Sequence, residues 1–465
     1  MTIDARDPGH SSVPNNPSTA NVQSATVAEA LSDVTSGRCQ FVELQFTDVS
    51  GALKGVVVPS SQIADALTYG HWFDGSSLEG GARTTETDLL LWPDLRTWSL
   101  VPWVQPEGMA RVLCDIRTPD GDPFPADPRA VLARAIADAG DLGFELFVAP
   151  ELEFFLFQSM SDGRRLPADR AGYFDLASDT GVRVREEIVR YLNAMNVSVD
   201  ASHHEIAPGQ HEIDLPLMPA ALAADAIVAV KYAVKAVARR RGLAPTFMPK
   251  PLAGVAGSGL HLHQTLRSSD GADVFWDPID EYGLSATARA YIAGQLSHAR
   301  AACAVLAPQV NSYKRLGRGF DAPSVIGWSQ RASQAMIRVP RPGLPGRSPD
   351  GRGRPIRVEL RCADPSCNPY LAIAVALGAG LDGIRQGLSA PEPVGVVEHG
   401  MPAGNVDMLP VSLGEALTEL AWDGVVRDTL GSQVHDRLLT ASEQEWQTYK
   451  SQVTEWEFGR AFDAS

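Results

Sequence analysis

Charged side chains alternate with apolar ones in a segment that has the composition of a buried β-strand. Residues 150–156 read Pro-Glu-Leu-Glu-Phe-Phe-Leu, so Glu151 and Glu153 stand two positions apart among aliphatic and aromatic residues. Side chains at i and i+2 of a strand lie on one face. Two like charges inside a core are costly unless a cation neutralises them. The segment therefore predicts a sheet with a cation-binding face; a solvated strand face is the alternative.

Two further segments place similar groups on strands. Glu205 and Glu212 flank a Pro-Gly turn, which predicts two adjacent strands of a hairpin. A Gly-Ser-Gly sequence precedes His261 and His263, which share one strand face. The glycines allow a ligand to come close to the backbone. A single histidine is usually structural, but a pair on one face beside other acidic segments favours a binding role.

A fourth segment alternates arginine and glutamate with apolar residues. Arg357, Glu359 and Arg361 share one face, which suits a metal ligand beside an anion-binding site. Mostly oxygen ligands with one imidazole favour Mg²⁺ or Mn²⁺ over Zn²⁺, and so many carboxylates predict two or more ions. The candidate metal ligands are Glu151, Glu153, Glu205, Glu212, His261 and Glu359.

The chain has no GxxxxGK[ST] loop, so an enzyme of this sequence that uses a nucleotide must hold the phosphates another way, and metal ions with arginines are the usual alternative. The Gly-Ser-Gly sequence does not follow the strand-then-helix pattern of a dinucleotide site. Several divalent ions with several arginines are the electrostatic apparatus of phosphoryl transfer. The candidate anion contacts are Arg315, Arg331, Arg338 and Arg361.

Composition excludes several classes of partner. The 465 residues include 40 basic and 56 acidic side chains, a net charge of −16. This charge argues against nucleic acid and against an anionic membrane surface. The longest apolar run, 371–381, is shorter than the ~18 residues that span a bilayer, and no signal peptide is visible. Five cysteines without CxxC spacing indicate reduced thiols and a cytoplasmic location.

The pattern along the chain predicts three regions. Residues 1–25 are a disordered arm, 26–125 a small β-rich domain, and 126–465 a larger mixed domain. The Pro- and Gly-rich stretch 340–355 is expected to be a mobile loop. Expected helices include 129–139, 183–195, 219–241, 286–306 and 369–386; expected strands include 40–46, 53–58, 144–157, 203–215 and 260–266.

Eight segments together form a recognisable pattern from about residue 40 to 460. They are Phe46–Asp48, Phe73–Ser77, Pro150–Phe157, His203–Glu212, Phe247–Pro251, Gly257–His263, Asn311–Leu316 and Arg357–Leu371. In these segments and in their order the chain resembles glutamine synthetase of type I. The resemblance implies an α+β fold, with an N-terminal β-grasp domain and a C-terminal catalytic domain of curved antiparallel sheet and flanking helices. It also implies a homo-oligomer of stacked hexameric rings, with active sites between subunits.

The resemblance also implies residue roles for a reaction of glutamate, ATP and ammonia or a small amine. Attack of the glutamate γ-carboxylate on ATP would form γ-glutamyl phosphate, which the amine, deprotonated by Asp74, then attacks. By motif position, Glu153, Glu205 and Glu212 bind the metal near glutamate, and Glu151, His261 and Glu359 bind the metal at the ATP phosphates. Gly257 and Arg315 hold the glutamate α-groups, Arg361 its γ-carboxylate, and His263, Arg331 and Arg338 serve ATP; Asp74, Tyr173 and Glu205 form the ammonium pocket, and Asp321 closes over the intermediate.

Several residues depart from the family pattern at the substrate-facing edge. Asp321 replaces the flap glutamate and is one methylene shorter, which leaves room for a larger amine. Ala256 stands where the family has asparagine before Gly-Ser-Gly, and Ser333 replaces an ATP-site arginine. The tyrosine motif of adenylylation control is not recognisable in 395–410. These changes favour a γ-glutamylamide synthetase that uses a small organic amine.

Two alternatives stay open on the sequence. The intact Phe-Asp-Gly-Ser-Ser motif around Asp74 favours ammonia, and hence a true glutamine synthetase in which the substitutions are neutral drift. A catalytically silent paralogue that only binds ligands is the other. The complete set of metal ligands argues against that reading, because nothing would hold so many acids together once metal binding was lost.

Overall fold

The chain is described by a computed structural model that covers residues 27–79, 87–104, 106, 108–161, 163–176, 179–317, 322–341, 355–395 and 406–462. The expected arm 1–25, the flap residue Asp321 and most of the loop 340–355 lie outside these residues. No helix in the described part of the chain is long and apolar enough to cross a membrane. The five cysteines are buried and unpaired, as the sequence predicted for reduced thiols.

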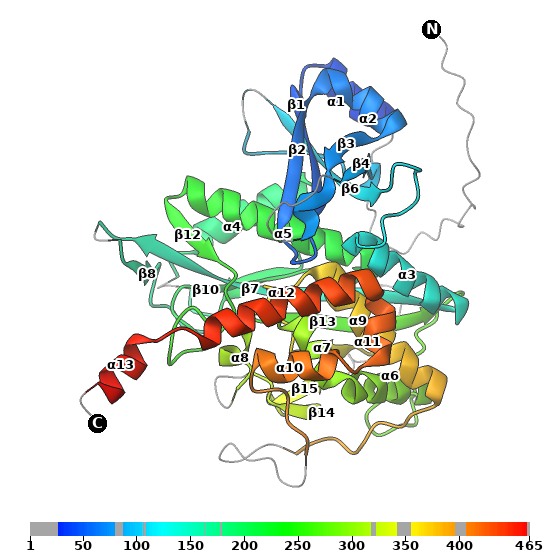
Figure 1. The fold of residues 1–465 in the computed structure, drawn as a ribbon, viewed down its shortest axis with the longest axis vertical. Helices are drawn as coiled ribbons and strands as arrows, with labels where there is room; N and C mark the ends of the chain where they lie inside the picture. The colour runs from blue at the N-terminus through cyan, green and yellow to red at the C-terminus, as the bar shows by residue number, and fades with distance from the viewer. Residues whose placement is uncertain are drawn as a thin grey trace.

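The N-terminal part is a mixed sheet with two helices beside it (Figure 1). The expected hairpin is confirmed: β1 (Phe41–Thr47) pairs antiparallel with β2 (Leu53–Pro59). Gly51 permits the turn with a φ of 81°, and the Asp48 side chain accepts a hydrogen bond from the Ala52 amide. The strand order is β2-β1-β6-β4-β3, with β6 (Met109–Arg117) parallel to β1. The other elements are α1 (Val27–Thr35), α2 (Ile63–Tyr69), β3 (His71–Asp74), β4 (Asp88–Pro93) and β5 (Ser99–Leu100).

The larger part contains a sheet of ten strands among the described residues, built around β7 (Phe144–Ser159). β7 is nearly continuously apolar and buried along its middle, which suits a central strand covered on both faces. β13 (Leu260–Ser268) and β10 (Gln210–Asp214) pair antiparallel with it. The sheet order is β14-β15-β16-β13-β7-β10-β9, and only β14 and β15 in that order run parallel. The remaining strands are β8 (Arg165–Pro167), β9 (Ala201–His204), β11 (Met218–Pro219), β12 (Leu243–Thr246), β14 (Val325–Ser329), β15 (Ala335–Arg338) and β16 (Val358–Leu360).

Helices pack on this sheet and on each other. The apolar helix α9 (Pro369–Gln386) contacts α6 (Ala286–Ser297) and α3 (Pro128–Asp141). It begins at Asn368, whose side chain accepts hydrogen bonds from two amides of the first turn, and it ends at Gly387 in the left-handed conformation. The other helices are α4 (Val182–Ala194), α5 (Ala220–Arg240), α7 (Ala299–Leu306), α8 (Ser312–Arg315), α10 (Leu413–Leu420), α11 (Gly424–Leu430), α12 (Ser432–Lys450) and α13 (Glu455–Ala461).

One expected helix, 286–306, is wrong as a single element. Residues 286–306 form two helices, α6 and α7, which meet at His298. The imidazole of His298 lies between the carboxylates of Asp423 and Asp382, at 2.7 and 3.1 Å. These tertiary contacts fix the break, and no local residue signals it, because the apolar pattern continues through the junction. The fold class is confirmed: an α+β chain with a small N-terminal sheet and a large, mostly antiparallel catalytic sheet.

Candidate active site

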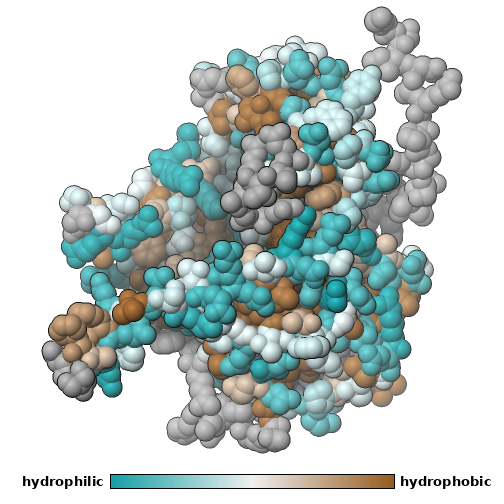
Figure 2. Space-filling view, in the orientation of Figure 1, coloured by the Kyte–Doolittle hydropathy of each residue, from teal (hydrophilic) through white to brown (hydrophobic). Residues whose placement is uncertain are grey.

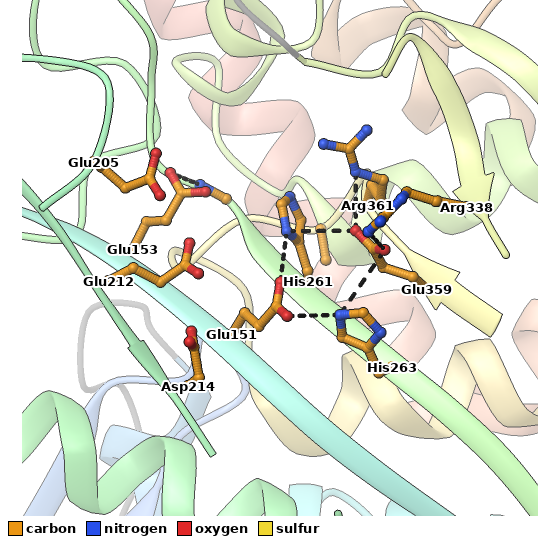
Figure 3. A network of polar contacts seen from close by, with 12 residues as sticks. Glu151, Glu153, Glu205, Glu212, Asp214, His261, His263, Arg338, Glu359 and Arg361 are labelled. Atoms are coloured by element: carbon orange, nitrogen blue, oxygen red, sulfur yellow. Dashed lines mark hydrogen bonds and ion pairs between the residues drawn. The ribbon is translucent and has the colours of Figure 1, made fainter. Parts of the chain in front are cut away.

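The register of the large sheet gathers the expected metal ligands on one face (Figure 3). Glu151 on β7 stands opposite His261 on β13, and Glu153 stands opposite Glu212 on β10. Glu359 on β16 stands opposite His263. Alternation within each strand and pairing between strands therefore bring distant residues together. Glu151 and Glu359, for example, are 208 positions apart in the sequence.

One group of ligands consists of Glu151, His261 and Glu359, each offering an atom within 4.8 Å of the others. His261 Nδ1 lies 3.2 Å from Glu151 and 3.8 Å from Glu359. His263 Nε2 lies 2.8 Å from the second oxygen of Glu151. Burial opposes ionisation of Glu151, but hydrogen bonds from the two histidines hold its pKa well below the usual range. This group is the predicted metal set next to ATP, and its geometry can hold a divalent cation.

A second group lies beside it and consists of His203, Glu205 and Glu212, whose ligand atoms also lie within 4.8 Å of one another. Glu153, expected in this set, is next to the group; its Oε2 accepts hydrogen bonds from Gln210 Nε2 and the Gly259 amide, at 2.7 and 3.1 Å.

The acids around this second group lie close to one another, and His203 lies 3.5 Å from Glu205 and 3.3 Å from Glu212. Burial raises the pKa of Glu153 to about 7. Burial and the charge of Glu153 raise the pKa of Glu205 to about 8, and the same causes raise the pKa of Glu212 well above its usual value. Oxygen ligands that repel one another in this way fit Mg²⁺ or Mn²⁺, whose charge would make all of them ionise.

Two arginines hold Glu359 from the side away from the histidines. Arg338 Nη1 donates to Glu359 at 2.7 Å, and Arg361 Nε lies 3.1 Å from its other oxygen. Arg361 also donates to the Ser333 carbonyl at 2.8 Å. Ser333, which stands where the family pattern has an arginine, thus holds Arg361 through its backbone. Arg331 is exposed, and its backbone amide donates to Ser329 Oγ at 3.2 Å.

The glycine loop and Arg315 form the floor of the site. A Cβ on Gly257 would lie 2.2 Å from the Pro249 carbonyl oxygen, so this position requires glycine, and a Cβ on Gly259 would lie 2.5 Å from Arg315 Nη2 and displace that guanidinium. Arg315 is buried, and its guanidinium donates to the carbonyls of Arg361 and Ala363, each at 3.1 Å. These bonds leave further N–H donors for a carboxylate.

Tyr173 stands at the rim of the second group. It is about half exposed and stacks on Phe174 with ring centroids 3.9 Å apart. Phe174 meets the imidazole of His203 edge-on at 4.8 Å. Burial, together with the charge of Glu205, raises the pKa of Tyr173 to about 12, so its hydroxyl stays protonated at neutral pH.

Asp74 does not join these residues within the chain. It ends β3, the outer strand of the N-terminal sheet, far from β7 in Figure 1. Its Oδ1 accepts hydrogen bonds from the amides of Ser76 and Thr87, at 3.0 and 3.1 Å.

Three residues of this site, His203, Gln210 and Asp214, were not among the residues expected from the sequence. His203 stands opposite Glu212, and Asp214 lies beside it on the same face of β10. Gln210 donates to both Glu153 and the Gly257 carbonyl. The same two-residue period, applied to residues 210–214, could have found Gln210 and Asp214, whereas His203 joins them through its pairing with Glu212.

Two family models match this chain and together cover most of it. The description "Glutamine synthetase, catalytic domain" matches residues 125–461, and "Glutamine synthetase, beta-Grasp domain" matches residues 38–119. The chain therefore belongs to the glutamine synthetase family and is an ATP-dependent carbon–nitrogen ligase. Members of this family use glutamate, divalent metals and ammonia or an amine, and they form oligomers.

Individual relatives divide between two names. A glutamine synthetase of Thermus thermophilus is 44% identical over 450 residues, covering 94% of this chain and 98% of that protein. One from Methanococcus maripaludis is 41% identical over 446 residues, covering 93% and 98%. Among solved structures, GmaS in complex with ADP matches with a TM-score of 0.82 at 32% identity, covering 93% of this chain and 99% of that one. GmaS without ligand matches with a TM-score of 0.81.

Proposed function

We propose that this enzyme joins glutamate to a small organic amine through γ-glutamyl phosphate, forming a γ-glutamyl amide. The observation that carries the proposal is the exposed Tyr173–Phe174 pair beside Glu205 and His203. An aromatic face next to carboxylates suits an alkylammonium ion, because the rings contact the alkyl group and attract the charge. Ammonia has no alkyl group for such a surface. The structural similarity to GmaS supports this choice of acceptor.

Ala256 supports the same choice. It is buried with Phe155, Phe157 and Ala207, at the position where the family pattern has asparagine. The site thus lacks a polar amide at the glutamate end and gains apolar lining. An apolar residue at this position would shift the preference for the acceptor toward an organic amine through apolar contact.

Residue roles follow from the two ligand groups. Glu151, His261 and Glu359 would hold the metal at the ATP phosphates; Glu205 and Glu212, with Glu153 beside them, would hold the metal near glutamate. Mg²⁺ or Mn²⁺ bound there supplies positive charge to the transferring phosphoryl group. Arg361 orients the γ-carboxylate, Gly257 and Arg315 the α-groups, and Arg338, Arg331 and His263 the nucleotide.

A subunit ring completes the site in this proposal. Asp74 lies at the outer edge of the N-terminal sheet, where it is available to a neighbouring subunit. The C-terminal helix α13 projects from the body (Figure 1), Trp456 and Phe458 on it are exposed, and Figure 2 shows hydrophobic residues at this end of the molecule. Exposed aromatic residues on a projecting helix suit contact with another copy. Asp74 of the neighbour then receives the proton of the attacking amine.

A glutamine synthetase that uses ammonia is the second candidate. The identity of 44% to the Thermus thermophilus enzyme favours it, as does the retained Phe-Asp-Gly-Ser-Ser motif at Asp74. Both candidates share all metal and nucleotide roles, so only the acceptor separates them.

Phosphate release from ATP, with glutamate and Mg²⁺, tests the proposal across ammonia, monoamines, diamines, polyamines and anilines. A higher kcat/KM with one organic amine than with ammonia supports the γ-glutamylamide synthetase. A preference for ammonia supports the second candidate. Mass spectrometry of the product confirms the γ-linkage. Absence of turnover with every amine, despite ATP and Mg²⁺ binding, points to the silent paralogue.

A further inference from the structure

A buried polar network adjoins the second group of metal ligands but takes no part in it. Asp169, His204 and His211 offer ligand atoms within 4.8 Å of one another, and all three residues are buried. His204 and His211 are partners on the adjacent strands β9 and β10. The composition and spacing of these three residues would also suit a metal site.

The surroundings of His211 argue against a cation there. Arg185 Nη1 lies 2.8 Å from His211 Nδ1, and Arg185 Nη2 donates to Asp179 at 2.6 Å. A guanidinium is permanently charged, so a divalent ion would lie beside an existing positive charge. The other ring nitrogen faces the backbone of Gly181, where an added Cβ would lie 2.6 Å from it. The network is therefore a set of hydrogen bonds and an ion pair that supports the structure, and not a metal site.

The network holds both ends of the turn that carries Glu205. At the start of the turn, His204 Nδ1 lies 2.7 Å from the Glu205 carbonyl oxygen. At the end, the Gly209 amide donates to Asp169 Oδ1 at 2.9 Å, and the same oxygen lies 2.8 Å from His204 Nε2. Carbonyl and carboxylate oxygens are acceptors, so both nitrogens of His204 donate. One carboxylate and one imidazole thus fix the ends of residues 205–209.

The position of this turn matters to more than one part of the site. Within it, the Ala207 amide donates to Gln210 Oε1 at 3.1 Å. Gln210 Nε2 then reaches Glu153 at 2.7 Å and the Gly257 carbonyl at 3.1 Å. A shift of the turn would therefore move both Glu205 and Gln210, the hydrogen-bond partner of Glu153.

We propose that Asp169 and His204 are positioning residues that set the Glu205 turn for metal binding. The inference rests on the proposed role of Glu205 as a ligand. Neither residue contacts the place where metal or substrate would lie; each acts through the turn. Groups that orient metal ligands in this way typically contribute 10- to 100-fold to affinity or activity.

The test compares Asp169→Asn and His204→Gln with the matched control Asp179→Asn. Asp179 belongs to the same buried network, through Arg185, and its hydrogen bond among the described residues is to that guanidinium and not to the turn. Mn²⁺ binding to the intact protein, followed by electron paramagnetic resonance of free Mn²⁺, gives a readout independent of turnover. Steady-state kinetics then separate the Mg²⁺ requirement, kcat and the KM for ATP.

We expect Asp169→Asn and His204→Gln to weaken one class of Mn²⁺ sites by ~10-fold or more and to lower kcat. The KM for ATP should change by less than about twofold, because the Glu151 group is untouched. Asp179→Asn should leave Mn²⁺ affinity near wild type even where it lowers the melting temperature. Asp169→Glu, which keeps a carboxylate, should recover part of the affinity.

Equal Mn²⁺ affinity in Asp169→Asn, His204→Gln and wild type overturns the positioning role, as does an equal loss in the Asp179→Asn control. If Asp169→Asn does not fold, the Mn²⁺ affinity of His204→Gln alone tests the positioning role. The glutamine amide can still donate a hydrogen bond to Asp169, but the bond to the Glu205 carbonyl is lost. Failure of the proposed function looks different: the wild-type protein itself would show no amine-dependent turnover.

Discussion

Glu153 on β7 and Glu212 on β10 face each other in register across the sheet, both buried and both with raised pKa values. Such a pair is unfavourable while both are ionised, and a shared cation reverses the sign of the interaction. Stability and metal binding are therefore linked at these two residues.

Glu212→Gln should weaken the dependence of stability on metal binding. The apo variant should be at least as stable as apo wild type, because one member of a repelling pair is gone. A ligand at 100 times its Kd stabilises a protein by about 2.7 kcal/mol, and the variant should gain less than wild type from the same Mg²⁺ concentration. Denaturant titrations with EDTA and with Mg²⁺ measure both effects. An identical Mg²⁺ gain in the two proteins would contradict the ligand assignment.

Glu359→Ala should nearly abolish turnover. The substitution removes an oxygen of the first ligand group and leaves the guanidiniums of Arg338 and Arg361 without their shared carboxylate. A loss of roughly 10²–10³-fold in kcat is the scale for removal of one group that stabilises transition-state charge. Glu145→Ala, at the exposed end of β7, is the matched control. Unchanged activity of Glu359→Ala would refute its place in the metal group.

Phe174→Gly tests the aromatic acceptor surface. Phe174 has a φ of 60°, a left-handed conformation that costs a non-glycine residue about 1–2 kcal/mol. Glycine removes that strain together with the ring. We expect a fall of ~10-fold in kcat/KM for the preferred organic amine relative to ammonia, without loss of thermal stability. A parallel fall for both acceptors would mean that the ring supports the loop and does not select the amine.

Asp321→Glu tests the flap. The added methylene should narrow the range of accepted amines, because one methylene in a pocket changes selectivity by roughly 10- to 200-fold. The measurement is kcat/KM for the largest accepted amine and for ammonia. The same substrate profile in variant and wild type would count against flap control of specificity.

His298 should make stability depend on pH. Hydrogen bonds to Asp423 and Asp382 raise the pKa of His298 above its unfolded value of about 6.5. Its contribution is therefore full below that unfolded pKa and is lost as the pH rises through the higher folded pKa.

The gap in melting temperature between wild type and His298→Gln should thus be larger at pH 6 than at pH 9. Both proteins need to be followed under the same scan rate and salt. A gap that widens with pH would show that the histidine acts here in its neutral form.

Much of the candidate site was predictable because strand geometry is local. A two-residue period places Glu151 with Glu153 and His261 with His263 whatever the rest of the chain does. The turn chemistry of Asp48 to Gly51 and the cap at Asn368 are local in the same sense. The break at His298 was not predictable, since its cause is Asp382 and Asp423, 84 and 125 residues away.

Sequence alone thus determined the kinds of ligand, the faces that carry them and the family to which they belong. Tertiary structure decided which candidate ligands lie close enough to share an ion. It put His203 with Glu205 and Glu212, brought Gln210 onto Glu153, and left Asp74 on a distant sheet edge. The physical reason is that side-chain alternation follows from the backbone of one strand, whereas register between strands follows from packing of the whole core.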